Sequence, residues 1–174
     1  MKPQFSNCYD HYFQVYALEF FYLILPWQWF KAQALAESEL DPTAKSPVGA
    51  FGVMQLMPPT SADMAAKLGI NNTPEIPHVN IRMGLAYDRQ CWDIWKKESG
   101  IERIRFMFGS YNAGPGHIVT AQQQAADSGL AADRWQSIVA MLPDVTGRNA
   151  TETINYVNKV ESLFGQLTTK EKCK

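Results

Sequence analysis

Residues 36–62 read AESELDPTAKSPVGAFGVMQLMPPTSA. Glycine and proline are absent up to Glu39 and frequent after it. The preceding residues, 27–39, contain few helix breakers and predict a helix. Pro42 ends it, because the residue before a proline avoids the helical region. The apolar residues that follow are interleaved with glycine and proline, which indicates compact turns or short strands. The stretch therefore predicts a helix with an acidic end that leads into a small irregular insertion.

The rest of the chain is predicted to be mainly α. Asn80 is expected to cap one long helix, and Ser99 with Glu102 has the spacing of a capping box for the next. The tail, residues 165–174, is expected to fray. The helices are expected at residues 12–22, 27–39, 60–68, 81–98, 99–112, 117–126, 133–142 and 150–164.

Composition narrows the class of protein. With 174 residues the chain suits one domain, residues 1–174, and we expect a monomer. Hydrophobic residues make up 46% and charged residues 19%, which excludes intrinsic disorder and a collagen-like fibre. A net charge of -1 argues against a nucleic-acid partner, because such proteins usually carry a basic surplus.

Cysteine and acid spacing give no sign of a metal site or a cofactor. Cys8, Cys91 and Cys173 lie far apart and form no CxxC or Cys/His pattern. Cys91 falls inside a helical pattern and is expected to be buried. No Asp-rich segment resembles a calcium-binding loop of about 12 residues. We therefore expect neither a metal nor a cofactor.

Residues 12–29 are the one apolar run that could enter a membrane or serve as a signal peptide. Glu19 and Pro26 interrupt the run, whereas a spanning helix needs about 20 mostly apolar residues. Ala32-Gln33-Ala34 resembles a signal cleavage site, but cleavage there would remove the residues just before Glu37. We therefore expect this segment to fold into the domain, with Phe20, Phe21 and Leu25 packed against the next helix, and no stable membrane anchor.

Glu37 is the residue with the most unusual expected setting. It shares a helix face with Phe30 and Ala34, and it lies in the last turn, where the helix dipole disfavours negative charge. Burial and the dipole would both raise its pKa, which suits a general acid. A partly exposed Glu at a helix end explains the same pattern, so these residues alone leave both readings open.

The surroundings of Glu37 resemble the signature of soluble lytic transglycosylases. These peptidoglycan-cleaving enzymes form family 23 of the glycoside hydrolases and are related to goose-type lysozyme. The matching residues are Glu37, Ser38, Pro42, Ser46, Gly49, Ala50, Gly52, Met54, Gln55, Met57 and Pro58. Two further blocks, SYNAGPG at 110–116 and ETINYVNKV at 152–160, follow in the family's order, and NIRMGLAY at 80–87 matches an architectural helix.

The resemblance covers residues 26–164 and implies a lysozyme-like α fold with a long sugar cleft. It implies that Glu37 is the single catalytic acid, later the base, for cleavage between N-acetylmuramic acid and N-acetylglucosamine in peptidoglycan strands. The muramoyl 6-hydroxyl would attack the anomeric carbon and form a 1,6-anhydro end, with the substrate's acetamido group assisting.

The resemblance also implies a set of substrate-binding residues. Gln55 would bind sugar, or else be a buried amide bound by backbone; Met54 would line the cleft, or else be core. The serines would bind the Glu37 carboxyl or the acetamido group, or Ser38 would cap the helix. Tyr111 and Tyr156 would lie near the acid, and Asn112 would support its loop. The full set is Ser38, Ser46, Gly52, Met54, Gln55, Tyr111, Asn112 and Tyr156.

Two departures bear on the activity. Goose-type lysozymes carry an Asp soon after Met-Gln, whereas Met57 and Pro58 follow here, which favours the transglycosylase. Val53 replaces the usual Leu. The alternatives are a hydrolytic muramidase, with Asp41 or Asp63 as second acid, and a non-catalytic glycan-binding module. We expect action at the cell wall or periplasm, with delivery by a phage or release at lysis; a bacterial cell-wall enzyme is the alternative.

Overall fold

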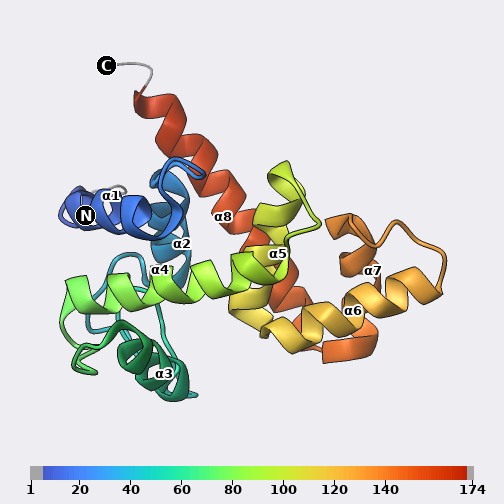
Figure 1. Ribbon diagram of the computed structural model, residues 1–174, viewed down its shortest axis with the longest axis horizontal. Coiled ribbons are helices and arrows are strands. Elements are labelled where there is room, and N and C mark those ends of the chain that lie inside the picture. The colour runs from blue at the N-terminus through green and yellow to red at the C-terminus, as the bar shows by residue number, and fades with distance from the viewer. Residues whose placement is uncertain (1–5, 172–174) are drawn as a thin grey trace. The chain divides into compact units, whose positions relative to one another are not determined.

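The computed structural model describes residues 6–171, with side chains as far as residue 169. Over that range the chain forms eight α-helices, and its β-structure is limited to two isolated bridges. The helices are α1 (Asp10–Phe21), α2 (Gln28–Ser38), α3 (Pro58–Leu68), α4 (Pro77–Ile94), α5 (Gly100–Ala113), α6 (Pro115–Asp127), α7 (Trp135–Thr146) and α8 (Asn149–Glu171), as labelled in Figure 1. The mainly α fold class is thus confirmed.

Three predictions about how helices begin or end are wrong, and the other helix bounds differ from the structure by up to four residues. Helix α4 begins at Pro77, so Asn80 lies inside the helix and does not cap it. Ser99 makes no side-chain capping bond; the Glu102 carboxylate instead accepts hydrogen bonds from the Trp135 amide and from Arg105. Helix α8 continues to Glu171, so the expected fraying is wrong for residues 165–171, and residues 172–174 lie outside the described part.

The chain forms two compact units. The first contains the described residues up to Tyr87 together with those from Val160 onward, and the second contains Asp88–Lys159. Helices α4 and α8 each contribute residues to both units. The assignment of the whole chain to one domain stays a prediction, and the units are described in turn below.

In the first unit, α1 packs against α2. The rings of Phe21 and Phe30 lie 4.7 Å apart between centroids, and both side chains are fully buried. Lys31 of α2 is only 2% exposed and forms an ion pair with Asp10 of α1. Leu25 is also buried and Phe20 is half-buried, so the predicted packing against the next helix is confirmed for Phe21. None of the helices in the described range is both long and apolar enough to span a membrane.

The end of α8 completes the first unit. Phe164 stacks on Trp29 of α2 with ring centroids 3.8 Å apart and planes inclined by 2°. Cys91 is buried, as expected, and Cys8 is exposed; Cys173 lies outside the described residues. The ring stack ties residues from opposite ends of the sequence into one core.

The predicted irregular insertion lies between α2 and α3. Lys45 pairs with Phe51, and Phe51 pairs with Leu56, as isolated antiparallel bridges. The amide of Gly52 donates to the carbonyl of Ala44 at 2.9 Å. Of the two alternatives, compact turns are confirmed, and residues 40–57 contain isolated bridges but no strand.

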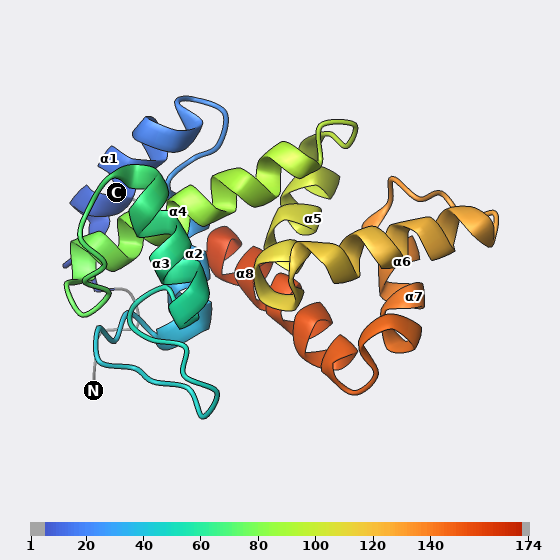
Figure 2. The same ribbon diagram turned by 60° about the horizontal axis from the view of Figure 1, so that its bottom comes forward.

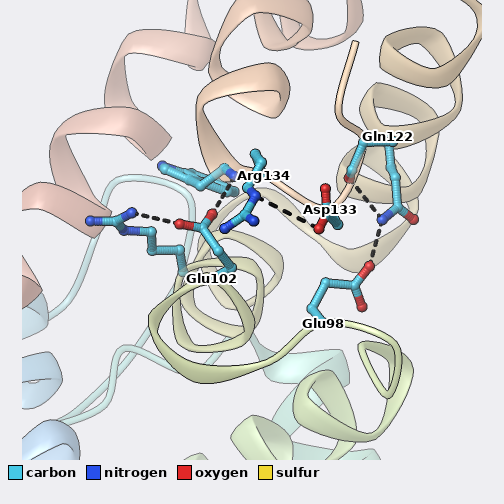
Figure 3. Close-up of polar contacts among 8 residues, drawn as sticks. Glu98, Glu102, Gln122, Asp133 and Arg134 are labelled. Carbon is cyan, nitrogen blue, oxygen red and sulfur yellow. Dashed lines mark hydrogen bonds and ion pairs between the residues drawn. The ribbon is translucent and has the colours of Figure 1, made fainter. Parts of the chain in front are cut away.

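In the second unit, α5, α6 and α7 lie side by side (Figure 2). Trp135 of α7 meets Phe106 of α5 edge to face, with centroids 5.8 Å apart. Polar contacts link the same elements: the Gln122 amide of α6 donates to Glu98 at 2.7 Å and to the carbonyl of Ala132 at 3.1 Å (Figure 3). These contacts hold the loop before α7 between its neighbours.

Replacing Gly109 with alanine is expected to destabilise the protein by about 1–3 kcal/mol, the usual cost of overpacking a core. A Cβ at Gly109 would lie 2.3 Å from Cη2 of Trp135, whose ring is buried and cannot swing away. Urea unfolding measures the effect. Gly165→Ala in α8 is the matched control: a Cβ there meets nothing within 4 Å. It should raise stability by about 0.5–1 kcal/mol through helix propensity. Equal stabilities for Gly109→Ala and the unaltered protein would contradict this account of the packing.

Candidate active site

Glu37 lies one residue before the end of α2 and is half-buried. Phe30 and Ala34, which precede it on the same face, are both fully buried. The helix therefore delivers a carboxyl group from an apolar face to the edge of the core, as the sequence pattern predicts. The carbonyls of the last helical turn put partial negative charge near this carboxyl.

Helix α2 ends through two consecutive left-handed residues. Glu39 has φ 56° and Leu40 has φ 65°, and neither is glycine. For such residues the left-handed conformation costs roughly 1–2 kcal/mol each. Leu40 is buried, and the Glu39 amide donates to the carbonyl of Leu35 at 3.2 Å, so packing and hydrogen bonding offset this cost. Strain of this kind, directly after a candidate catalytic acid, is typical of functional sites.

The serines of the predicted site bind backbone. Ser38 donates its hydroxyl proton to the carbonyl of Val53 at 2.7 Å, so it ties the end of α2 to the insertion rather than capping the helix. The Ser46 hydroxyl accepts the amide of Ala50 at 2.9 Å and shapes the tip of the same insertion. Both serines thus order the loop beside Glu37.

Gln55 also orders the insertion. Its side-chain amide donates to the carbonyls of Ala44 at 3.0 Å and Gly52 at 2.9 Å, which matches the backbone-bound alternative. A hydrogen bond from a sugar would therefore be accepted by the Oε1 atom. Gln55 itself has φ 46°, a second site of left-handed backbone outside glycine in this region.

Gly52 and Met54 are both buried. Gly52 has φ 80°, and Met54 is fully buried against Gly84 of α4, where an added Cβ would lie 2.7 Å from the Met54 Cγ. The Met54 side chain thus fits the core alternative and not the exposed surface that sugar contact requires. The Gly52 amide donates to the carbonyl of Ala44, and a Cβ at Gly52 would lie 2.5 Å from the Nδ2 of Asn80, so the close approach that this glycine allows is to helix α4.

The remaining predicted residues belong to the second unit. Tyr111 and Asn112 are half-buried in the last turn of α5, and Tyr156 is buried on α8. The Asn112 side chain accepts the hydroxyl of Thr153 at 2.8 Å, which joins α5 to α8 and agrees with the expected supporting role. Tyr156 follows Thr153 on the same helix face. The structure thus places Asn112 where α5 contacts α8, with Tyr111 beside it in the sequence of α5.

The other acids considered for water activation have local partners. Asp41 accepts hydrogen bonds from both the amide and the hydroxyl of Thr43, at 2.9 and 2.8 Å. Asp63 is paired with Lys67 at 2.8 Å on α3, where both side chains are more than half exposed. Within residues 6–171, no three His, Cys, Asp or Glu side chains are grouped so that they could hold a metal ion.

Asn80 is the residue that sequence reasoning misplaced. Its side chain is fully buried and contacts the insertion: Oδ1 accepts the amide of Met54 at 2.8 Å, and Nδ2 donates to the carbonyl of Phe51 at 3.0 Å. The sequence signal, Asn before an apolar helix, is shared with ordinary caps. Pro77 was the available clue, because proline favours the first turn of a helix and moves the start upstream.

Comparison with known proteins gives concordant matches. The family model described as the transglycosylase SLT domain matches residues 24–133. The membrane-bound lytic murein transglycosylase F of Desulfosudis oleivorans is 30% identical over 157 residues, which cover 83% of this chain and 34% of that protein. The chain thus spans about a third of the length of this relative.

Solved structures show the same fold. The 70 kDa soluble lytic transglycosylase of Escherichia coli matches with a TM-score of 0.72 and 27% identity, covering 92% of this chain and 24% of that one. An inactive mutant of the lytic transglycosylase Slt of Pseudomonas aeruginosa matches with a TM-score of 0.70 and 26% identity, covering 95% and 25%. The predicted lysozyme-like fold is confirmed by these likenesses.

Proposed function

The chain belongs to the transglycosylase SLT domain family, and from that premise we propose that it is a peptidoglycan lytic transglycosylase. It cleaves the β-1,4 bond between N-acetylmuramic acid and N-acetylglucosamine and leaves 1,6-anhydromuramic ends. The observation that supports this most is the setting of Glu37: a half-buried acid at a strained helix end, inside the matched residues, beside an ordered loop.

Glu37 performs both proton transfers of the reaction. As an acid it protonates the glycosidic oxygen while the bond to the anomeric carbon breaks. The resulting carboxylate then takes the proton of the muramoyl 6-hydroxyl, whose oxygen bonds to the anomeric carbon. Glu37 ends protonated, and no water is consumed. The substrate's acetamido group stabilises the cationic centre, so no protein nucleophile is needed.

The loop of residues 44–56, in the same unit as Glu37, supplies substrate contacts. Gln55 offers its Oε1, while Gly52, Ser38 and Ser46 act by ordering the loop. Tyr111, Asn112 and Tyr156 stay substrate-binding residues that the family resemblance predicts. The glycan strands of the cell wall are the partner. A monomeric state and delivery by a phage or at lysis stay predictions of the sequence.

Digestion of purified peptidoglycan is expected to yield anhydro muramoyl ends. The 6-hydroxyl belongs to the reacting sugar, and its effective concentration exceeds that of water by orders of magnitude. Mass spectrometry should find these ends about 18 Da lighter than hydrolytic ends, because no water is added. They should also resist borohydride reduction. Mostly reducing ends would instead support the hydrolytic muramidase, with Asp41 or Asp63 as its second acid.

A further inference from the structure

The insertion that carries Gln55 packs against helix α4. Asn80 and Gly84 lie one helical turn apart on one face of α4, and both contact residues 51–54. A Cβ at Gly52 would lie 2.5 Å from the Nδ2 of Asn80, and a Cβ at Gly84 would lie 2.7 Å from Met54. The loop therefore packs closely against the helix at two points, Gly52 against Asn80 and Met54 against Gly84.

One peptide unit of the insertion is held from both sides. The C=O of Val53 and the N–H of Met54 belong to the same rigid plane. Ser38, next to Glu37 on α2, donates to this C=O at 2.7 Å, and Asn80 on α4 accepts this N–H at 2.8 Å. The orientation of the plane is thus set by two helices, and Gln55 is the residue after Met54.

We propose that Asn80 is a positioning residue of the active site: through the Val53–Met54 peptide plane, it holds Gln55 in register with Glu37. The inference rests on the proposed function. Asn80 satisfies two loop groups at once, the Phe51 carbonyl and the Met54 amide, which no apolar residue of similar size could do. Without it these groups lose their partners, and the left-handed Gln55 loses the support that offsets its strain.

The test compares Asn80→Ala with Ile81→Ala. Ile81 is a fully buried neighbour on the same helix, so its truncation lowers stability while both hydrogen bonds of Asn80 remain. Turnover of soluble peptidoglycan strands is measured well below both melting temperatures. Asn80→Ala should lower kcat about 10–100-fold, as expected for a displacement near 1 Å, with Ile81→Ala within about twofold of the unaltered protein. Equal kcat values in the two variants would overturn the proposal.

A double-mutant comparison tests the route through Gln55. If Asn80 acts by placing Gln55, then adding Asn80→Ala to Gln55→Ala should cost less than about threefold, because coupled residues are not additive. A full 10–100-fold loss in the Gln55→Ala background would show that Asn80 acts elsewhere, against the proposal.

Amide hydrogen exchange tests the inference without an activity measurement. The Met54 amide should exchange faster in Asn80→Ala than global stability explains, and not in Ile81→Ala. If the unaltered protein has no transglycosylase activity, the proposed function is refuted. The exchange rate of the Met54 amide would still show whether Asn80 holds the Val53–Met54 peptide plane. An active protein whose Met54 exchange and kcat are unaffected by Asn80→Ala would refute the inference alone.

Discussion

Replacing Glu37 with glutamine is expected to lower the rate of peptidoglycan cleavage by about 10²–10⁴-fold, the usual contribution of a positioned general acid or base. Glutamine has nearly the same shape, so the half-buried site at the end of α2 should keep its packing. It can neither protonate the glycosidic oxygen nor take the proton of the 6-hydroxyl. The release of soluble fragments from purified cell walls measures the rate, and thermal unfolding checks the fold.

Glu39→Gln is the matched control for this variant. Glu39 lies two residues further on, is exposed, and holds its left-handed conformation through backbone contacts that glutamine retains. Its cleavage rate should stay within about twofold of the unaltered protein, since removing an exposed surface charge changes little. A Glu37→Gln variant that cleaves as fast as Glu39→Gln would remove the central assignment of the site.

Deleting residues 1–25 is expected to abolish soluble, folded protein. The deletion removes α1, which uncovers Phe30 and takes Asp10 away from Lys31. It also removes Phe13 and Phe21, which are both fully buried, and losing the core packing of one such ring costs about 3–5 kcal/mol. A domain of this size is stable by only about 5–15 kcal/mol, so little would remain. Expression yield, size-exclusion chromatography and circular dichroism measure the outcome.

The control for this deletion is a variant that lacks residues 1–5, which keeps α1 and every contact named above. It should be soluble and unfold at nearly the temperature of the unaltered protein. A soluble, active protein without residues 1–25 would instead mean that the segment is an appendage of the domain.

Much of the fold could be predicted from local chemistry. Pro42 and the glycines of the insertion mark its bounds in the sequence, and each helix of the described residues was expected close to its observed place. The errors occurred where a tertiary partner changed a local preference. Glu102, expected in a capping box, instead accepts the amide of Trp135, and α8 continues past Phe164 because that ring stacks on Trp29. Local propensity carries no information about such partners.

The candidate site was less accessible from the sequence. Glu37 could be singled out as an acid on an apolar helix face, but only the family resemblance favoured catalysis over an ordinary helix end. The two hydrogen bonds that fix the Val53–Met54 peptide plane could not be predicted, because they join backbone groups to side chains from separate helices. Ser38 and Asn80 both have local capping roles that are equally consistent with the sequence alone.

Helix α8 contributes residues to both units, and this affects the order in which the units can fold during synthesis on the ribosome. The second unit is continuous in sequence, so all of it has been made once Lys159 leaves the exit tunnel. The first unit needs residues from Val160 onward, including Phe164 for the stack on Trp29, and stays incomplete until these have also been made. The N-terminal helices therefore wait longest for their partner, although nascent domains usually fold in chain order. During that interval the surfaces of α1 and α2 are what a nascent-chain chaperone would meet.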